Sequence, residues 1–278
     1  MSLSGAARLA GVLGWPVEHS LSPRLHGHWL DRYGIDGAYL PLPVKPEDFS
    51  TAVKGLIAAG FRGFNVTVPH KEAAYAACDE LDEAARRIGA VNTIVVKDGR
   101  LIGSNTDAYG FAENLRAGSP TWRPAAGPAL VLGAGGAARA VIVALLDLGV
   151  PEVRLCNRTK ARAEALADSF AGSIRVVDWE DRDIACAELG LLVNTTSLGL
   201  AGHDPLELNL QALPPDTLVT DIVYNPLETP LLAQARARGN PLVDGLGMLL
   251  HQAKPGFEAW FGVTPTVDDK LRAFVLGG

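Results

Sequence analysis

The sequence predicts an α/β fold built on largely parallel sheets, and three observations lead to this prediction. Short apolar runs alternate with helix-like stretches along the chain, which is the pattern of α/β architecture. A glycine-rich segment, residues 133–138 (GAGGAA), lies directly between an apolar run and a helical stretch. The length of 278 residues suits two domains, at roughly 150 residues per domain.

The composition excludes several classes of protein. The chain is 48% hydrophobic and carries a net charge of −6, and it has no long basic run of the kind that forms a nucleic-acid surface. No apolar stretch approaches the ~20 residues that a membrane span requires, and the N-terminus does not resemble a secretory signal. The three cysteines lack C-x-x-C spacing, which favours a reducing compartment without disulfides or structural zinc. We therefore expect a cytoplasmic protein that binds neither nucleic acid nor a membrane.

The first part of the chain alternates predicted strands and helices before ending in a hairpin. Ser22 and Pro23 are typical of a helix start, with Ser22 as the N-cap. The Asp98-Gly99 pair predicts the turn of the hairpin. The expected strands are 8–13, 37–42, 63–68, 92–97 and 100–103, and the expected helices are 23–33, 46–59 and 71–78.

A second strand and helix series begins near residue 128, after a loop rich in proline and glycine (118–128) that suggests a domain boundary. The expected strands are 129–132, 152–156, 174–177, 191–194, 217–222 and 241–243, and the expected helices are 137–148, 159–170 and 231–238. The tail differs, because residues 245–260 place apolar side chains on one helical face and 265–275 predict a final helix.

The glycine-rich segment has the G-x-G-x-x-A spacing of a dinucleotide-binding turn. Gly133 permits a tight turn, Gly135 lets the backbone approach a pyrophosphate, and Ala138 allows the helix to pack closely on the strand. The N–H groups at the start of the helix would then face the phosphates. This context predicts a Rossmann-type domain, against the alternative of a glycine loop that only packs tightly.

The second strand of this series indicates which nucleotide is bound. It ends at Asn157 without the carboxylate that holds the ribose 2′-hydroxyl of NAD. Arg158 offers a planar guanidinium suited to a 2′-phosphate, Thr159 adds a hydroxyl, and Arg162 follows one turn later. We therefore predict NADP(H) rather than NAD(H), although Asn157 and Thr159 are also residues that cap helices.

Residue types alone identify fewer candidates for a substrate site than for the nucleotide site. Ser20 and Ser22 stand two apart before a helix, and Lys71 and Asp107 each lie at a predicted helix start. Each has a simpler interpretation, since Ser22 and Asp107 suit capping and Lys71 suits a solvated surface. The six histidines form no ligand pair of known spacing, so we expect no metal site. Cys156 lies in a predicted buried strand and is expected to be structural.

The motifs taken together resemble the shikimate dehydrogenase family over nearly the whole chain. The pieces that carry this resemblance are GWPVEHSLSPRLH (14–26), NVTVPHK (65–71), GAVNT (89–93), NTDAYGF (105–111), GAGGAARA (133–140), NRTKARA (157–163), NTTSLG (194–199), DIVYNPLETPLL (221–232) and DGLGMLLHQA (244–253). Their order along the chain makes the set specific, whereas each piece alone would not be.

The resemblance implies roles for individual residues. Lys71 and Asp107 correspond to the family's catalytic pair. The implied substrate-binding residues are Ser20, Ser22, Thr67, Lys71, Asn92, Asp107, Tyr224 and Gln252. The implied cofactor-binding residues are Gly133, Ala134, Gly135, Gly136, Ala137, Asn157, Arg158, Thr159, Arg162, Thr195, Ile222, Gly245 and Met248.

The resemblance also implies an activity and a domain organisation. The activity is reversible reduction of 3-dehydroshikimate to shikimate with NADPH, within aromatic amino acid biosynthesis, by a monomer or homodimer. The substrate domain would comprise residues 1–108 and 244–278, around a nucleotide domain of residues 109–243. Two alternatives stay open at this point, namely a relative acting on quinate or an aminated shikimate analogue, and a non-catalytic NADP sensor.

Overall fold

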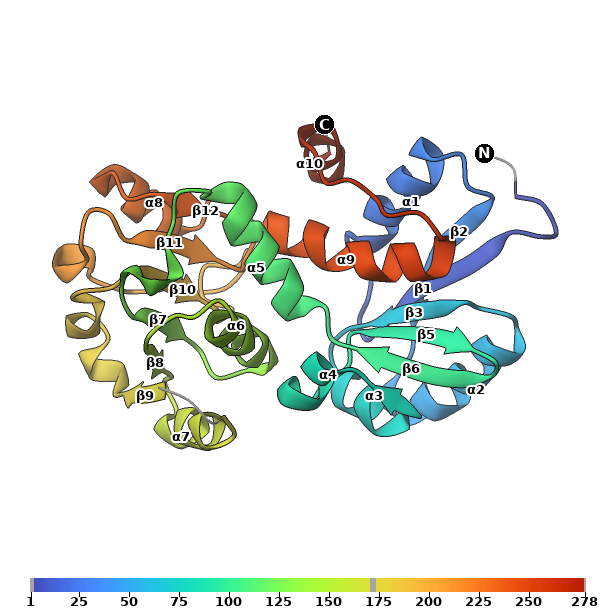
Figure 1. The fold of residues 1–278 in the computed structure, drawn as a ribbon, viewed down its shortest axis with the longest axis horizontal. Coiled ribbons are helices and arrows are strands. Elements are labelled where there is room, and N and C mark those ends of the chain that lie inside the picture. The colour runs from blue at the N-terminus through green and yellow to red at the C-terminus, as the bar shows by residue number, and fades with distance from the viewer. Residues whose placement is uncertain (1–2, 171–173, 278) are drawn as a thin grey trace. The chain divides into compact units, whose positions relative to one another are not determined.

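The computed structural model describes residues 3–170 and 174–277, which form two compact units (Figure 1). Unit 1 runs to Thr106 and resumes at Gln252, and unit 2 runs from Asp107 to His251. The division falls inside helix α9 (Leu246–Phe261), so this helix contributes residues to both units.

Within its described residues, unit 1 holds a six-stranded sheet in the order β2-β1-β3-β5-β6-β4. Strands β1, β2 and β3 are parallel, whereas β5 runs antiparallel to both β3 and β6. The strands are β1 (Arg8–Gly14), β2 (Gly37–Pro43), β3 (Gly63–Val66), β4 (Glu80–Leu81), β5 (Thr93–Lys97) and β6 (Arg100–Ser104). The helices are α1 (Ser22–Arg32), α2 (Phe49–Ala58), α3 (Lys71–Ala77), α4 (Glu83–Ile88) and α10 (Asp269–Leu276).

An aromatic cluster on unit 1 packs α1 and α9 against the sheet. His26 of α1 stacks on Tyr39 of β2, with ring centroids 3.9 Å apart and planes at 3°. Trp29, Phe257 and Trp260 surround this pair and are fully buried. The Trp260 indole N–H donates to the carbonyl of residue 94 at 3.0 Å, which fixes α9 on the sheet. A separate apolar cluster of unit 1 includes Leu13, Phe64 and Ile94 of the sheet.

The sheet of unit 2 is parallel throughout its described strands, in the order β12-β11-β10-β7-β8-β9. Read from the other end this is 3-2-1-4-5-6, the doubly wound order of a Rossmann domain. The strands are β7 (Ala129–Leu132), β8 (Val153–Cys156), β9 (Ile174–Val177), β10 (Leu191–Asn194), β11 (Leu218–Asp221) and β12 (Leu242–Val243). The helices are α5 (Asp107–Gly118), α6 (Gly136–Asp147), α7 (Lys160–Asp168) and α8 (Pro230–Arg238). The predicted fold class is confirmed.

Several local predictions are wrong. Ser22 does not cap α1, because the N-cap is Leu21 and Ser22 is the first helical residue. Helix α10 begins at Asp269 rather than at 265, because the Asp268 side chain accepts the Leu271 N–H and starts the helix there. The loop 118–128 is no boundary but lies inside unit 2, where the Trp122 indole donates to the Gly190 carbonyl at 3.1 Å.

Two further helix starts lie at or within one residue of the expected positions. Thr159 occupies the N-cap position of α7 as predicted, but its side chain makes no capping hydrogen bond within the described chain. Helix α5 begins at Asp107 itself, one residue earlier than expected. Helix ends commonly differ by one residue between criteria, so the second difference has little physical weight.

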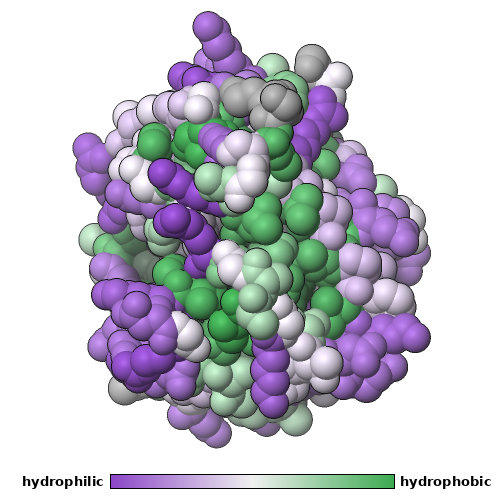
Figure 2. Space-filling model, turned by 90° about the vertical axis from the view of Figure 1, so that its right-hand side faces the viewer, coloured by the Kyte–Doolittle hydropathy of each residue, from purple (hydrophilic) through white to green (hydrophobic). Residues whose placement is uncertain are grey.

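The surface is mixed in character. On the face drawn in Figure 2, hydrophobic residues gather toward the middle and hydrophilic ones toward the rim. Val68 and Ile184 are the most exposed large apolar side chains among the described residues, at 69% and 73%. No described helix combines the length and the hydropathy needed to cross a membrane.

Candidate functional site

Polar residues collect along one edge of the unit 1 sheet. Ser20 and Ser22 follow the carboxyl end of β1, and Thr67 follows the carboxyl end of β3. Asn92 precedes β5, and because β5 is antiparallel its start lies at this same edge. Carboxyl ends of parallel strands are where ligands bind in α/β sheets. The topology of unit 1 therefore brings these predicted side chains to a common edge.

Ser22 is connected to this edge through Tyr39. The Ser22 hydroxyl interacts with the Tyr39 hydroxyl and lowers its pKa, and Tyr39 donates to Asn65 Oδ1 at 2.6 Å. The backbone N–H of Ser22 donates to Ser20 Oγ at 3.3 Å. Burial raises the pKa of the Tyr39 hydroxyl well above its usual value, so Tyr39 keeps its proton. Both serines are thus placed by contacts with neighbouring residues.

Asn92 is the most heavily bonded of the predicted residues. It is 3% exposed, and its Oδ1 accepts from the Thr106 N–H at 2.9 Å and from the Thr93 hydroxyl at 2.9 Å. Its Nδ2 donates to Thr106 Oγ1 at 3.0 Å and to Gln252 Oε1 at 3.4 Å. Gln252 of α9, predicted from the far end of the sequence, therefore lies beside Asn92.

The remaining unit 1 candidates lie next to these residues. Lys71 opens α3, and its carbonyl accepts the Val91 N–H at 3.0 Å. The Thr67 N–H donates to the Leu13 carbonyl at 2.8 Å. The Thr67 methyl lies against Gly14, where an added Cβ would meet it at 2.5 Å.

Asp107 and Tyr224 belong to unit 2. Asp107 is the first residue of α5 and is half-buried. Tyr224 lies in the segment after β11, and burial raises the pKa of its hydroxyl.

The glycine-rich turn of unit 2 fits a dinucleotide phosphate. Gly133 has a φ of +109°, and a Cβ there would meet Thr195 Oγ1 at 2.7 Å. At Gly135 and Gly136 the opposite holds, since no described atom lies within 4 Å of an added Cβ. The open space adjoins the N-terminus of α6, where Gly135 is the N-cap and has no side chain to satisfy the helix N–H groups. Backbone donors facing open space are what a pyrophosphate requires.

Asn157 and Arg158 lie together at the carboxyl end of β8. They line one cavity of about 450 Å³ with Trp179, Arg182 and Thr196. The Arg182 guanidinium lies 4.8 Å from the centroid of the Trp179 ring, over its face. Asn157 Nδ2 donates to the Thr159 carbonyl at 2.9 Å.

Thr159 and Arg162 are exposed and do not line this cavity. Arg162 sits on α7, where its N–H donates to the Thr159 carbonyl at 3.0 Å.

Three other predicted cofactor residues, Thr195, Ile222 and Gly245, follow the carboxyl ends of the neighbouring strands β10, β11 and β12. Thr195 follows β10, and its hydroxyl donates to the Leu132 carbonyl at 2.7 Å, beside the glycine turn. Gly245 packs against the carbonyl of Ile222, so closely that an added Cβ would overlap it. Met248, in the first turn of α9, is half-buried.

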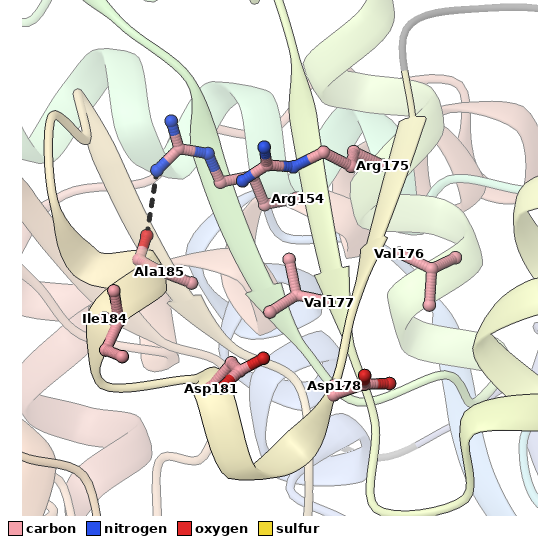
Figure 3. Close-up of a pocket in the computed structure, with 8 residues that line it drawn as sticks. All are labelled: Arg154, Arg175, Val176, Val177, Asp178, Asp181, Ile184 and Ala185. Atoms are coloured by element: carbon pink, nitrogen blue, oxygen red, sulfur yellow. Dashed lines mark hydrogen bonds between the residues drawn. The ribbon is translucent and has the colours of Figure 1, made fainter.

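A second cavity of unit 2, about 460 Å³, opens along the edge strand β9 (Figure 3). Arg154 and Arg175 reach into it, which would suit an anion. However, the Arg154 guanidinium donates to the carbonyls of Ala185 at 3.0 Å and Ala187 at 2.7 Å, and to Glu152 at 2.9 Å. These contacts identify Arg154 as a structural residue, so the cavity at Asn157 is the better nucleotide candidate.

Sequence reasoning missed the side chains that connect the predicted ones. Tyr39, Asn65, Thr93 and Thr106 join Ser22 to Asn92 and Gln252 through buried hydrogen bonds. The only available signal was the polar Asn65 at a buried position of a strand, since a buried amide needs partners. Trp179 and Arg182 carried no motif and were missed as cavity-lining residues. No cluster of three potential metal ligands occurs among residues 3–170 and 174–277.

Comparisons with known proteins show the family. The family described as "Shikimate dehydrogenase substrate binding domain" matches residues 12–94, and "Shikimate / quinate 5-dehydrogenase" matches residues 124–199. The chain is 64% identical to the NADP(+) shikimate dehydrogenase of Paramagnetospirillum magneticum, covering 99% of this chain and 100% of that protein.

Two solved structures are similar over nearly the whole chain. The shikimate 5-dehydrogenase of Thermus thermophilus, in complex with NADP(H) and shikimate, shares 42% identity and a TM-score of 0.85, with 97% of each chain covered. The quinate dehydrogenase of Corynebacterium glutamicum, in complex with NAD, has a TM-score of 0.91 at 32% identity, with 97% of this chain and 99% of that chain covered.

Proposed function

The chain belongs to the shikimate dehydrogenase family, and from that premise we propose that it interconverts 3-dehydroshikimate and shikimate using NADP(H). The observation that carries the proposal is the joint presence of two features. One is the hydrogen-bonded polar edge of unit 1 that holds Ser22, Asn92 and Gln252. The other is the open glycine turn of unit 2, with Arg158 at the end of the next strand.

Substrate binding falls to hydroxyl and amide groups in this proposal. Ser20, Ser22 and Thr67 offer hydroxyls, and Asn92 and Gln252 offer amides, for a ligand rich in hydroxyl groups with one carboxylate. Tyr224 is a further hydroxyl that keeps its proton because burial raises its pKa. Such groups can donate and accept, so they suit a polyol better than an apolar ligand.

Lys71 and Asp107 carry the proton chemistry in this proposal. The nicotinamide, when bound, supplies or accepts the hydride at the substrate carbon. In the reducing direction the carbonyl oxygen would gain negative charge, which the Lys71 ammonium would stabilise before donating a proton to it, and in the oxidising direction Lys71 would take the hydroxyl proton back. Asp107, the second member of the implied catalytic pair, would share the proton chemistry with Lys71.

The cofactor residues divide by the part of the nucleotide they hold. The turn from Gly133 to Ala137 binds the pyrophosphate through backbone N–H groups. Asn157 and Arg158, which line the cavity, would hold the 2′-phosphate, with Thr159 and Arg162 close by in the sequence, and Arg158 would give the preference for NADP(H). Thr195, Ile222, Gly245 and Met248 approach the nicotinamide half.

The test is spectrophotometric turnover at 340 nm with shikimate and NADP, with NAD and quinate as comparison ligands. We expect the highest kcat/KM for shikimate with NADP. Lys71→Ala should lower kcat by about 10²–10⁴-fold, the usual effect of removing a positioned acid or base. Lys54→Ala, at an exposed lysine of α2, is the matched control and should leave kcat unchanged. A kcat within about threefold of wild type in Lys71→Ala would reject the catalytic role.

The finer organisation is part of the same proposal. Residues 1–108 with 244–278 act as the substrate and catalytic domain, and residues 109–243 act as the NADP domain. The protein works in the cytoplasm as a monomer or homodimer, without nucleic acid or membrane. Its three cysteines, all within the described residues, are unpaired. Light scattering after size-exclusion chromatography measures the oligomeric state. Cell fractionation with a tagged protein measures its cellular compartment.

A further inference from the structure

We propose that Tyr39, Asn65 and Thr93 form a buried hydrogen-bonded relay that positions Ser22 and Asn92 for substrate. This inference rests on the proposed function, because Ser22 and Asn92 are its substrate-binding residues. Tyr39, Asn65 and Thr93 are positioning residues, which act on the ligand only through Ser22 and Asn92.

The Asn65 amide determines the direction of every bond in the relay. Its Nδ2 lies 3.1 Å from the Asn92 carbonyl and 3.0 Å from Thr93 Oγ1. A carbonyl oxygen only accepts, so the nitrogen of the amide must face it. Oδ1 therefore faces Tyr39, and the Tyr39 hydroxyl must donate to it across 2.6 Å.

The direction at Asn65 fixes the hydroxyl of Ser22. The only proton of the Tyr39 hydroxyl is used on Asn65, so its oxygen can only accept in its contact with Ser22. Tyr39 therefore offers the Ser22 hydroxyl an acceptor before any ligand arrives. A hydroxyl rotor fixed in advance costs less ordering entropy when a ligand binds.

The same logic runs from Asn65 to the other end of the relay. Thr93 Oγ1 accepts from Asn65, so its own hydrogen is available for Asn92 Oδ1 at 2.9 Å. With Oδ1 also accepting the Thr106 N–H, the Asn92 amide is oriented so that Nδ2 points toward Gln252. The relay thus orients side chains at two separate parts of the proposed substrate site.

The aromatic ring that carries the Tyr39 hydroxyl is itself fixed. The His26 ring stacks on the Tyr39 ring with centroids 3.9 Å apart, and the centroid of the Trp260 ring lies 6.0 Å from that of Tyr39. Tyr39 is 6% exposed. Removing only its hydroxyl therefore leaves the ring packing in place and isolates the hydrogen-bonding role.

The first experiment compares Tyr39→Phe with Tyr33→Phe. Tyr33 is the matched control, because its hydroxyl accepts the Thr266 N–H at 3.0 Å in the same unit but outside the relay. We expect Tyr39→Phe to raise KM for shikimate about fivefold, as for loss of one neutral hydrogen bond. Its kcat should stay within twofold, its KM for NADP should not change, and Tyr33→Phe should match wild type in all three.

A second pair keeps the proposal testable even if Tyr39→Phe folds poorly. Thr93 is the first residue of β5. Thr93→Val keeps the shape of this side chain and removes its hydroxyl, and valine is favoured in strands. We expect Thr93→Val to raise KM for shikimate, and Thr93→Ser, which restores the hydroxyl, to return it to near the wild-type value. A purely structural role would not be rescued in KM by serine.

The double variant Ser22→Ala/Tyr39→Phe separates the relay from general damage. If Tyr39 acts through Ser22, then Tyr39→Phe raises KM less on the Ser22→Ala background than on wild type. An equal increase on both backgrounds overturns the inference, as does wild-type KM in Tyr39→Phe or a failure of Thr93→Ser to rescue Thr93→Val. If the wild-type protein does not oxidise shikimate at all, the proposed function and the relay both fall.

Discussion

His26 should make the folding stability of this protein depend on pH between 7 and 5. Its side chain is 0% exposed, and neither ring nitrogen has a hydrogen-bond partner in the part of the chain that the structure describes. Burial lowers its pKa to about 3. The rings around it belong to Trp29, Tyr39, Phe257 and Trp260, and none of these carries a charge.

The sign of the effect follows from which state binds the proton. In the unfolded chain a histidine has a pKa of about 6.5. As the pH falls below that value the unfolded chain gains a proton at residue 26 and the folded chain does not, so the free energy of unfolding decreases. The slope approaches about 1.4 kcal/mol per pH unit, and the loss between pH 7 and pH 5 is about 2 kcal/mol. This loss depends only on the folded pKa lying well below 5.

The test is His26→Phe, which retains a flat ring for Tyr39 but cannot titrate. Urea unfolding of both proteins at pH 7 and pH 5, at constant ionic strength, gives the difference in the free energy of unfolding. We expect the variant to gain about 2 kcal/mol relative to wild type on moving from pH 7 to pH 5. His203→Phe, at an exposed histidine, should show no such gain. An equal difference at both pH values would refute the reasoning.

Two further predictions concern the nucleotide domain. Arg158→Ala should lower the ratio of kcat/KM with NADP to kcat/KM with NAD about 10–100-fold, which is the contribution of a hydrogen bond to a charged group. Arg175→Ala, at the other cavity, is the control and should leave this ratio unchanged. Initial rates with both cofactors measure the ratio, and an unchanged ratio in Arg158→Ala would exclude Arg158 as the selective residue. Gly135→Val should abolish NADP binding in a fluorescence titration yet leave the melting temperature near wild type, because its side chain meets open space. Gly133→Ala should instead lower the melting temperature, because its Cβ would press on Thr195 from a φ of +109°; equal melting temperatures for the two variants would contradict the geometry.

Four strands of unit 2, β7, β8, β10 and β11, are short runs in which every residue is buried, and such runs are easily recognised in a sequence. The expected strands 129–132, 174–177 and 191–194 agree residue for residue with β7, β9 and β10. In a parallel sheet covered on both faces, a strand is nearly all apolar. Gly133 directly after β7 and Asn194 at the end of β10 mark where those two runs stop, whereas the edge strand β9 has no buried residue. The motif residues at those ends were predictable for the same reason.

The hydrogen-bonded relay was not predictable, because it depends on which strands are neighbours. Tyr39 and Asn65 meet because β1 pairs with both β2 and β3, which brings together side chains 26 residues apart. No local pattern encodes that pairing. The prediction that Ser22 caps α1 was wrong for a similar reason. Serine before proline is a common helix cap in local sequence, but the interaction of this serine with Tyr39 depends on the tertiary fold.

The two units prepare their candidate sites by opposite physical means. In unit 2 the turn after β7 exposes backbone N–H groups, and what matters is the absence of side-chain atoms at Gly135 and Gly136. In unit 1 the polar edge consists of side chains, and the Asn92 amide is oriented by a series of buried side chains that begins at Tyr39. Adding a methyl group should therefore be the damaging change in the first site, and removing a single oxygen the damaging change in the second. Substitutions in unit 1 should alter KM for substrate while NADP binding is retained, because the relay involves no residue of the glycine turn.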